Sequence, residues 1–295
     1  MRSVLLTWIA FPTAGRGDIV GTGFIVGGAP SGHAIALTAK HVIADGVVHV
    51  QTPNRRHATS ALPEFLPPAS PKVNPEAIRA VWMGGASADL MLVEHVFYAQ
   101  SLDIAVTLVR PQDHVDTIRL SPLAIDTSMP EVGEQVILYS CSGLEFEGGK
   151  IGKGDVGAIG RAVVARTGHV TEVFLDGHRQ YRWPCFTTTI PAEPGMSGGI
   201  VCRSRADDRI AVCGVVSADW STDEARKDFR YAGESLIAAV WPSLGLEVPW
   251  LVGEAFETRL LLDVVREGAI VDLGDGVDRF TIIPRGDGHS VHRRA

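Results

Sequence analysis

The chain has 295 residues, of which 45% are hydrophobic and 21% charged, so it can bury a large core and is not a disordered chain. Acidic residues outnumber basic ones by 34 to 27, and the formal net charge of −7 argues against broad nucleic-acid binding. Its 32 glycines and 17 prolines predict many turns and favour an all-β fold. No apolar run approaches the roughly 20 residues that a transmembrane helix requires.

The N-terminal segment is apolar and has two interpretations. Residues 4–11 read Val-Leu-Leu-Thr-Trp-Ile-Ala-Phe after Met-Arg-Ser, a pattern that a short signal peptide shares. The run is short for a signal core, lacks a clear small-x-small cleavage site, and is soon followed by the Gly-Thr-Gly-Phe of residues 21–24. We therefore expect the first strand of a β-sheet and a cytoplasmic protein.

Short apolar segments separated by turn residues continue through the first half of the chain. They predict strands at residues 4–12, 19–27, 33–39, 46–51, 78–83, 89–95 and 103–109. Residues 52–76 differ, because their high proline content excludes a central strand or a long helix. This segment is predicted to be a surface loop that either shapes a substrate cleft or is an inert linker.

The second half shows the same pattern after a connection at residues 111–132. A strand opening at residue 133 is followed by predicted strands near 160–167, 182–190, 199–203, 209–217 and 228–232. The glycine-rich stretch 143–160 between the first two is predicted to be a mobile loop. Residues 233–245 contain an apolar run bounded by glycines and predict a closing helix that Pro242 would end early.

Past about residue 246 the pattern becomes irregular. Residues 258–267 suit a helix or a strand, and 269–273 and 279–283 are predicted to pair as a hairpin across a Gly-Asp-Gly turn. Residues 286–295 are expected to be frayed. We expect a small accessory element, too short for a separate enzyme domain.

A serine between glycines is the most informative motif, at residues 194–199 (Pro-Gly-Met-Ser-Gly-Gly). Glycines permit unusual backbone angles and close approach of a substrate carbonyl, which suits Ser197 as a nucleophile on a tight turn. Gly195, Met196 and Ser197 would form the oxyanion hole, with the N–H groups of Gly195 and Ser197 as the donors. Taken alone, the motif also fits a plain turn.

Two further motifs supply the partners that a serine nucleophile needs. His41 ends an apolar strand and would take the proton from Ser197, while Asp103 opens another strand and would orient His41. Asp89, which also opens an apolar strand, is the alternative carboxylate.

The order His41, Asp103, Ser197 resembles that of the chymotrypsin/trypsin-like serine peptidases, in particular bacterial trypsin-like and Deg-type domains. The resemblance covers roughly residues 4–245. It implies a serine endopeptidase that cleaves a protein or peptide substrate through an acyl-enzyme intermediate, with two six-stranded antiparallel β-barrels and the active site in the cleft between them.

The implied domain organisation follows the motifs. Residues 1–120 would form the first barrel, residues 121–245 the second, and residues 246–295 a C-terminal extension of unknown role. The histidine and aspartate then lie in the first barrel and the serine in the second.

The resemblance also implies substrate-binding residues. Ser217, Ala218 and Asp219 would form one wall of the primary specificity pocket, and Pro191, six residues before the serine, would lie at its base. Because Pro191 carries no charge, it does not support a strong preference for Arg or Lys. Asp219 or Asp228 is the alternative source of negative charge there, although both are most simply solvated turn carboxylates.

Met196 is a departure from extracellular trypsins, which have an acidic residue immediately before the serine. That acid pairs with a new N-terminus after cleavage, so activation of this kind is not expected here. A cytoplasmic peptidase still needs restraint, and narrow specificity, a closed resting site, a regulatory partner or a homo-oligomer would supply it.

No cofactor, metal, membrane or nucleic-acid partner is predicted. Residues 152–157 fit G-x-G-x-x-G, but no βαβ unit surrounds them, and His33, His41 and His49 have no matching metal cluster. The alternatives to a peptidase are an esterase with the same triad and a peptide-binding module without turnover.

The four cysteines do not form a dense disulfide framework. Free buried thiols are the simpler expectation, and they agree with a reducing compartment. A disulfide between Cys202 and Cys213, which flank a predicted hairpin, is the alternative.

Overall fold

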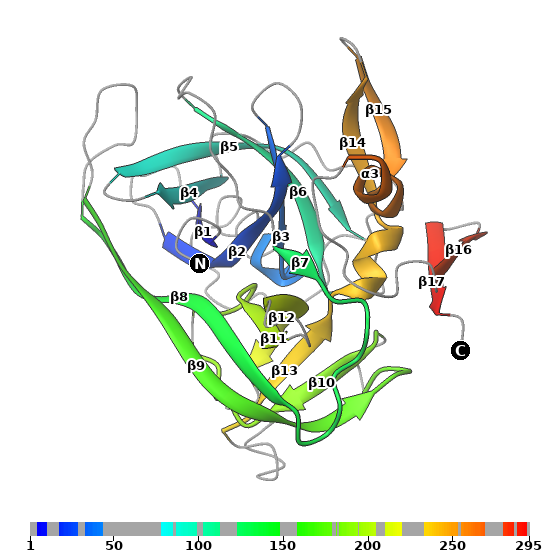
Figure 1. Cartoon of the computed structure of the whole chain (residues 1–295). Coiled ribbons are helices and arrows are strands. Elements are labelled where there is room, and N and C mark those ends of the chain that lie inside the picture. The colour runs from blue at the N-terminus through cyan, green and yellow to red at the C-terminus, as the bar shows by residue number, and fades with distance from the viewer. Residues whose placement is uncertain are drawn as a thin grey trace.

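The computed structural model describes the following residues: 5–10, 18–28, 33–43, 78–84, 87–98, 103–112, 123–147, 158–178, 181, 183–193, 195–204, 210–219, 233–252, 255–268, 280–285 and 288–293. Most of them lie in two closed antiparallel barrels of six strands each, with smaller elements after them (Figure 1). The predicted all-β class with two six-stranded barrels is confirmed.

The first barrel closes because β1 pairs with both β2 and β4. The strand order around it is β1-β2-β3-β6-β5-β4. Large apolar side chains such as Trp8, Phe24 and Leu37 fill its interior and are fully buried, and this burial favours the barrel over an open sheet. The segment predicted as either strand or signal peptide is β1. The six strands are β1 (Leu5–Ala10), β2 (Asp18–Gly28), β3 (Ala34–Thr38), β4 (Ile78–Gly84), β5 (Ser87–Tyr98) and β6 (Ala105–Pro111).

The second barrel has the strand order β11-β8-β9-β10-β13-β12, and it closes through the pairing of β11 with β12. A short strand, β7 (Ala124–Ile125), adds to the outside of β12 in parallel. The six barrel strands are β8 (Gln135–Glu147), β9 (Ala158–Phe174), β10 (Cys185–Thr188), β11 (Ile200–Ser204), β12 (Ile210–Asp219) and β13 (Ser235–Ala239).

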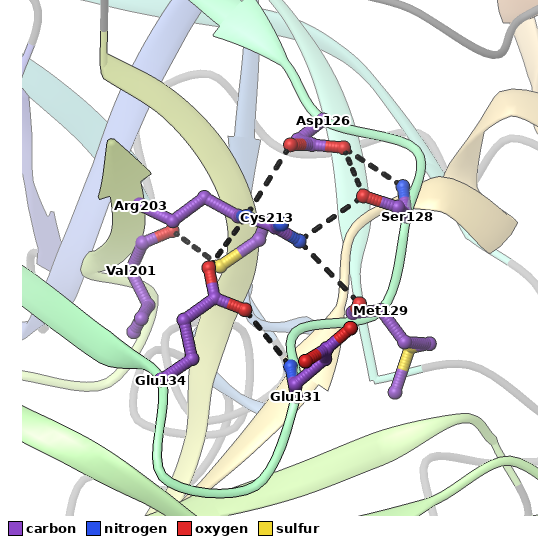
Figure 2. Close-up of polar contacts among 8 residues, drawn as sticks. All are labelled: Asp126, Ser128, Met129, Glu131, Glu134, Val201, Arg203 and Cys213. Carbon is purple, nitrogen blue, oxygen red and sulfur yellow. Dashed lines mark hydrogen bonds and ion pairs between the residues drawn. The ribbon is translucent and has the colours of Figure 1, made fainter. Parts of the chain in front are cut away.

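Arg203 on β11 forms ion pairs and hydrogen bonds with the segment between β7 and β8 (Figure 2). Its guanidinium lies 2.8 Å from Glu134 Oε1 and 3.5 Å from Asp126 Oδ2. It also donates to Ser128 Oγ at 3.1 Å and to the carbonyl of Met129 at 3.4 Å. One cation thus neutralises two half-buried carboxylates, so the entry to the second barrel is fixed by charge as well as by strand pairing.

The predicted closing helix at residues 233–245 is wrong. This segment forms β13 and then a short 3-10 helix, η3 (Trp241–Gly245). Leu236 and Ala238 pair with β12 on one side and β10 on the other. The apolar run that suggested a helix is therefore a barrel strand buried on both faces, a case that composition alone does not separate from a buried helix.

The C-terminal segment also differs from expectation. Residues 280–285 form β16 (Phe280–Arg285), which pairs with β17 (Gly288–Arg293), whereas the expected partner at residues 269–273 lies outside the described residues. The residues predicted to be frayed therefore include a paired strand. Closer to the barrels, β14 (Glu247–Val252) pairs with β15 (Ala255–Leu260), which leads into α3 (Leu261–Gly268).

The first part of this extension is anchored in the first barrel. Strand β14 contacts β5 and β6. Val248 and Leu261 are fully buried and belong to the same apolar cluster as Leu37 of the first barrel and Val215 of the second. This cluster is continuous across both barrels, so apolar burial holds them together.

All four cysteines are free and buried, as expected. Cys202 packs in the cluster that spans both barrels, whereas Cys213 packs in a separate cluster of the second barrel, so the alternative disulfide between them does not form. In the part of the chain described above, no helix is long and apolar enough to cross a membrane.

Several predicted elements lie outside the described residues. They are the strands at 46–51 and 228–232, the proline-rich loop 52–76, the segment 269–273 and the glycine motif 152–157. The predicted loop at 143–160 is wrong at both ends, because β8 continues to Glu147 and β9 begins at Ala158, and its residues 148–157 lie outside the described residues.

Candidate active site

His41 lies on a single helical turn, residues 40–43, just after β3. The neighbouring Ala39, Val42 and Ile43 are buried in the core and fix the backbone of the turn. The side chain of His41 remains 35% exposed. The first barrel therefore holds the histidine rigidly while leaving its ring accessible to a substrate.

Asp103 immediately precedes β6 and is the carboxylate that contacts His41. His41 Nδ1 lies 3.0 Å from Asp103 Oδ2, and the His41 backbone N–H donates to Oδ1 at 3.3 Å. Ser217 Oγ of the second barrel donates to Oδ2 at 2.5 Å. The competing candidate, Asp89, lies on β5 opposite Trp82 of β4.

The electrostatics of Asp103 favour the ionised form. Burial acts to raise the pKa of Asp103, but the charge of His41, the hydrogen bonds from His41 and Ser217 and the charge of Lys40 outweigh it and lower that pKa. An ionised carboxylate only accepts hydrogen bonds, so His41 Nδ1 must carry the proton in this contact. When His41 is neutral, this leaves the lone pair on Nε2, where a general base needs it.

The serine lies on a turn with glycines at strained positions. The Met196 N–H donates to the carbonyl of Glu193 at 3.0 Å, and Gly195 has φ of +89°. A positive φ at the third position of such a turn is the pattern of a type II turn. Gly198 has φ of +81°, and a Cβ there would lie 1.9 Å from the carbonyl oxygen of Thr22. Both glycines are thus required by the conformation.

Two backbone donors on this turn have no hydrogen-bond partner among the residues that the structure describes. The N–H groups of Gly195 and Ser197 donate to no residue that the structure describes, whereas that of Met196 is used within the turn. The Ser197 hydroxyl likewise makes no hydrogen bond to a described residue, His41 included. Within the described part of the chain, this hydroxyl and these two amide donors are therefore not used in holding the turn.

Met196, where extracellular trypsins have an acid, is fully buried. Its side chain packs in an apolar cluster with Phe186 and Val216, and its Sδ accepts the Glu193 N–H at 3.2 Å. The side chain beneath the serine therefore supports the turn by packing and a backbone contact, without a charge.

Gly21 brings the histidine and serine segments together. A Cβ on Gly21 would lie 2.6 Å from a methyl of Val42 and 2.8 Å from the carbonyl oxygen of Ser197. The residue after His41 and the backbone of Ser197 therefore lie against the same point of β2. The segments that carry His41 and Ser197 therefore meet at β2.

The predicted substrate-binding residues differ in their exposure and contacts. Ser217 is buried, with its hydroxyl on Asp103. Pro191 is exposed, and its carbonyl accepts a hydrogen bond from Arg166 at 3.0 Å. The backbones of Ala218 and Asp219 pair with β13, and their side chains lie outside the described part.

A family model described as a trypsin-like peptidase domain matches residues 21–212, which include His41, Asp103 and Ser197. The chain belongs to the trypsin-like peptidase family. Its match begins in β2 and ends in β12, so the family relationship spans both barrels of this peptidase domain. No protein with a curated description matches the sequence.

Two solved structures show weak overall similarity to this trypsin-like domain. The Rv3671c protease in its inactive form is 15% identical, with a TM-score of 0.43 and coverage of 81% of this chain and 84% of that chain. A serine-to-alanine mutant of Rv3671c from M. tuberculosis H37Rv, also inactive, is 17% identical, with a TM-score of 0.42 and coverage of 81% and 82%.

Sequence reasoning missed two contributors to the site. Ser217 was expected only in substrate binding, and its contact with Asp103 depends on the docking of two distant segments. Thr22 was not singled out, although it contacts the backbone of the serine turn. The glycines on both sides of Thr22 were the available signal, because paired glycines within a strand indicate close approach of another backbone.

Proposed function

We propose that this protein is a serine endopeptidase that hydrolyses peptide bonds in a protein or peptide substrate, with Ser197 as nucleophile, His41 as general base and Asp103 as the residue that orients His41. The observation that carries the proposal is the contact of Asp103 with His41 Nδ1, in a chain whose glycine turn has a serine hydroxyl and two amide donors without a hydrogen-bond partner among the described residues. Membership of the trypsin-like peptidase family supports the same chemistry.

The reaction begins when Ser197 Oγ attacks the carbonyl carbon of the substrate and its proton passes to His41 Nε2. The carbonyl oxygen becomes an oxyanion, which accepts hydrogen bonds from the N–H groups of Gly195 and Ser197. His41 then gives its proton to the leaving amine as the C–N bond breaks, and an acyl-enzyme remains. A water molecule, deprotonated by His41, then attacks the acyl carbon; the bond to Ser197 Oγ breaks, His41 returns the proton to Oγ, and the acid product leaves.

Asp103 acts through His41 in this mechanism. When His41 accepts the serine proton it becomes an imidazolium, which the buried carboxylate beside it stabilises. The lowered pKa of Asp103 keeps that carboxylate ionised throughout the neutral range. The Ser217 hydroxyl supplies a second donor and holds Asp103 in the required orientation.

The end of β12 supports the proposed binding of substrate. Its last pair with β11 is Val215 with Ile200, while β12 continues along β13 as far as Asp219. Among the described strands, residues 217–219 therefore have a neighbour on one side only. We propose that an extended substrate adds there as a further strand, with Pro191 at the base of the adjoining pocket; main-chain pairing of this kind tolerates many sequences.

The decisive experiment is labelling with a fluorophosphonate, followed by intact mass. We expect one adduct on the wild type, none on Ser197→Ala, and full labelling of Ser204→Ala, a control at an exposed serine of the same barrel. Cleavage of casein and of a peptide ester by the labelling-competent protein then separates a peptidase from an esterase. A folded wild type that takes no adduct would overturn the proposal and favour a binding module.

We also propose a cytoplasmic location, because the four cysteines are free and buried. Fractionation of the native host tests this: recovery of the protein with secreted or envelope fractions would contradict it. A bacterial origin stays a prediction from the resemblance of the motifs.

A further inference from the structure

Thr22 of the first barrel contacts the serine turn of the second barrel at two points. Its backbone N–H donates to the carbonyl of Ser197 at 2.7 Å, and its Oγ1 donates to the carbonyl of Gly195 at 2.9 Å. The same Oγ1 accepts the N–H of Cys141 at 3.0 Å. A single residue therefore connects the turn to β2 and to β8.

The two carbonyls that Thr22 holds alternate with the two proposed oxyanion donors. Along the chain, the Gly195 N–H is followed by the Gly195 carbonyl, then by the Ser197 N–H and then by the Ser197 carbonyl. Fixing both carbonyls fixes the peptide planes that flank the Met196–Ser197 peptide. The direction of the Ser197 N–H then depends on Thr22, and so does its separation from the Gly195 N–H, whose own direction also depends on the φ of Gly195.

Thr22 is itself rigidly placed. It is fully buried, and its carbonyl accepts a hydrogen bond from Thr38 Oγ1 at 2.7 Å. The absence of a side chain at Gly198 lets the turn reach it, since a Cβ there would lie 1.9 Å from that same carbonyl. A hydroxyl is needed at this point because one atom both donates to Gly195 and accepts from Cys141, which a methyl group cannot do.

We propose that Thr22 is a positioning residue of the active site, which sets the geometry of the oxyanion donors from the opposite barrel. The inference rests on the proposed function. It complements the contact of Ser217 with Asp103: a residue of each barrel holds a proposed catalytic element of the other. The donors are thus in place only when the barrels are docked at this junction.

The test is the second-order rate of fluorophosphonate labelling, which does not require the natural substrate. In this step Ser197 Oγ forms a bond to phosphorus, the P–F bond breaks, fluoride leaves and His41 takes the serine proton. The developing charge on the phosphoryl oxygen requires the same donors as a peptide carbonyl. We expect Thr22→Val to label about 10- to 100-fold more slowly than the wild type, as misplacement of a site by a fraction of an ångström to one ångström does.

Thr107→Val is the matched control. Thr107 is a fully buried threonine of β6 in the same barrel, and its Oγ1 donates to the carbonyl of Ala36 at 3.2 Å. We expect this variant to lose thermal stability, as Thr22→Val does, yet to label within about twofold of the wild type. Equal slowing of the two variants would show a merely structural role and overturn the inference.

Thr22→Ser keeps the test decisive if Thr22→Val does not fold. Serine retains the donor and acceptor and loses a methyl, so labelling within about threefold of the wild type is expected despite lower stability. A folded Thr22→Ser that labels more than tenfold slower, or a folded Thr22→Val that labels at the wild-type rate, overturns the role of Thr22 alone. A wild type that takes no adduct overturns the proposed function and this inference together.

Discussion

Replacing Gly195 by alanine tests the turn that presents the oxyanion donors without disturbing the packing around it. A Cβ at this position would have only the carbonyl oxygen of Cys141 near it, at 3.8 Å, so the substitution introduces no clash. Its whole effect comes from the backbone, because Gly195 has φ of +89° and alanine disfavours this region by about 1–2 kcal/mol.

The turn has a way to relieve that penalty. Conversion from type II to type I changes ψ at the second position from about +120° to about −30° and φ at the third from about +80° to about −90°. These rotations turn over the peptide between residues 194 and 195 and reverse the Gly195 N–H, while the Gly195 carbonyl can stay on Thr22. We therefore expect Gly195→Ala to remain folded, with an unfolding free energy within about 1 kcal/mol of the wild type.

Activity should respond far more than stability. Loss of one oxyanion donor slows acyl transfer about 10²- to 10³-fold, and fluorophosphonate labelling of Ser197 should slow to a similar degree. Gly133→Ala is the control, because Gly133 also has φ of +87° in a turn closed by the Glu134 N–H and the Glu131 carbonyl, with open space around its Cβ. Labelling of Gly195→Ala within threefold of the wild type, with folding intact, would refute the assignment of this turn.

Three further outcomes follow from the contacts of the site and the barrels. Ser217→Ala should slow labelling about three- to tenfold, less than Asp103→Asn, because it removes one hydrogen bond to an ion that His41 still holds; equal rates of the two variants would contradict this order. The lowered pKa of Asp103 in the folded protein predicts a stabilisation that is fully present above the ordinary pKa of 3.8 and is lost as pH falls through the folded-state pKa. The unfolding free energies of the wild type and Asp103→Asn, measured with urea, should therefore converge as pH falls below about 4. Arg203→Met should lower the unfolding free energy by about 1–3 kcal/mol, since Asp126 and Glu134 lose their cation, and should leave labelling within twofold.

Local patterns were sufficient to predict the strands of the first barrel, the strands β8 to β12 of the second barrel and the three proposed catalytic residues. Glycines beside Ser197, and His41 and Asp103 at strand ends, are signals carried by adjacent residues. The contact of Asp103 with His41 was expected from the same motifs and is present at 3.0 Å. Its assignment as catalytic stays a proposal until the serine is labelled.

The errors arose where pairing partners are distant in sequence. Residues 235–239 have the composition of a buried helix, and only their pairing with both β10 and β12 makes them a strand. The hydroxyl of Ser217 carries no local signal of the segment it meets across the barrel junction, and for Thr22 the flanking glycines indicate a close approach without identifying the partner.

Met196 leads to a last expectation about how the site becomes competent. In extracellular trypsins the acid before the serine needs a newly cut N-terminus to hold the turn, but here Met196 is fully buried among apolar side chains and accepts the Glu193 N–H through sulfur. Thr22 and the pairing of Gly198 and Gly199 with Val216 hold the rest of the turn. A protein blocked at its N-terminus by a fused tag should therefore label at Ser197 within twofold of the tag-free protein. Labelling that appears only after the tag is cut away would show that a free N-terminus assembles the turn, against the role given to Met196. The variant Met196→Asp should label more slowly than the wild type, because it places an unpaired carboxylate in that apolar cluster.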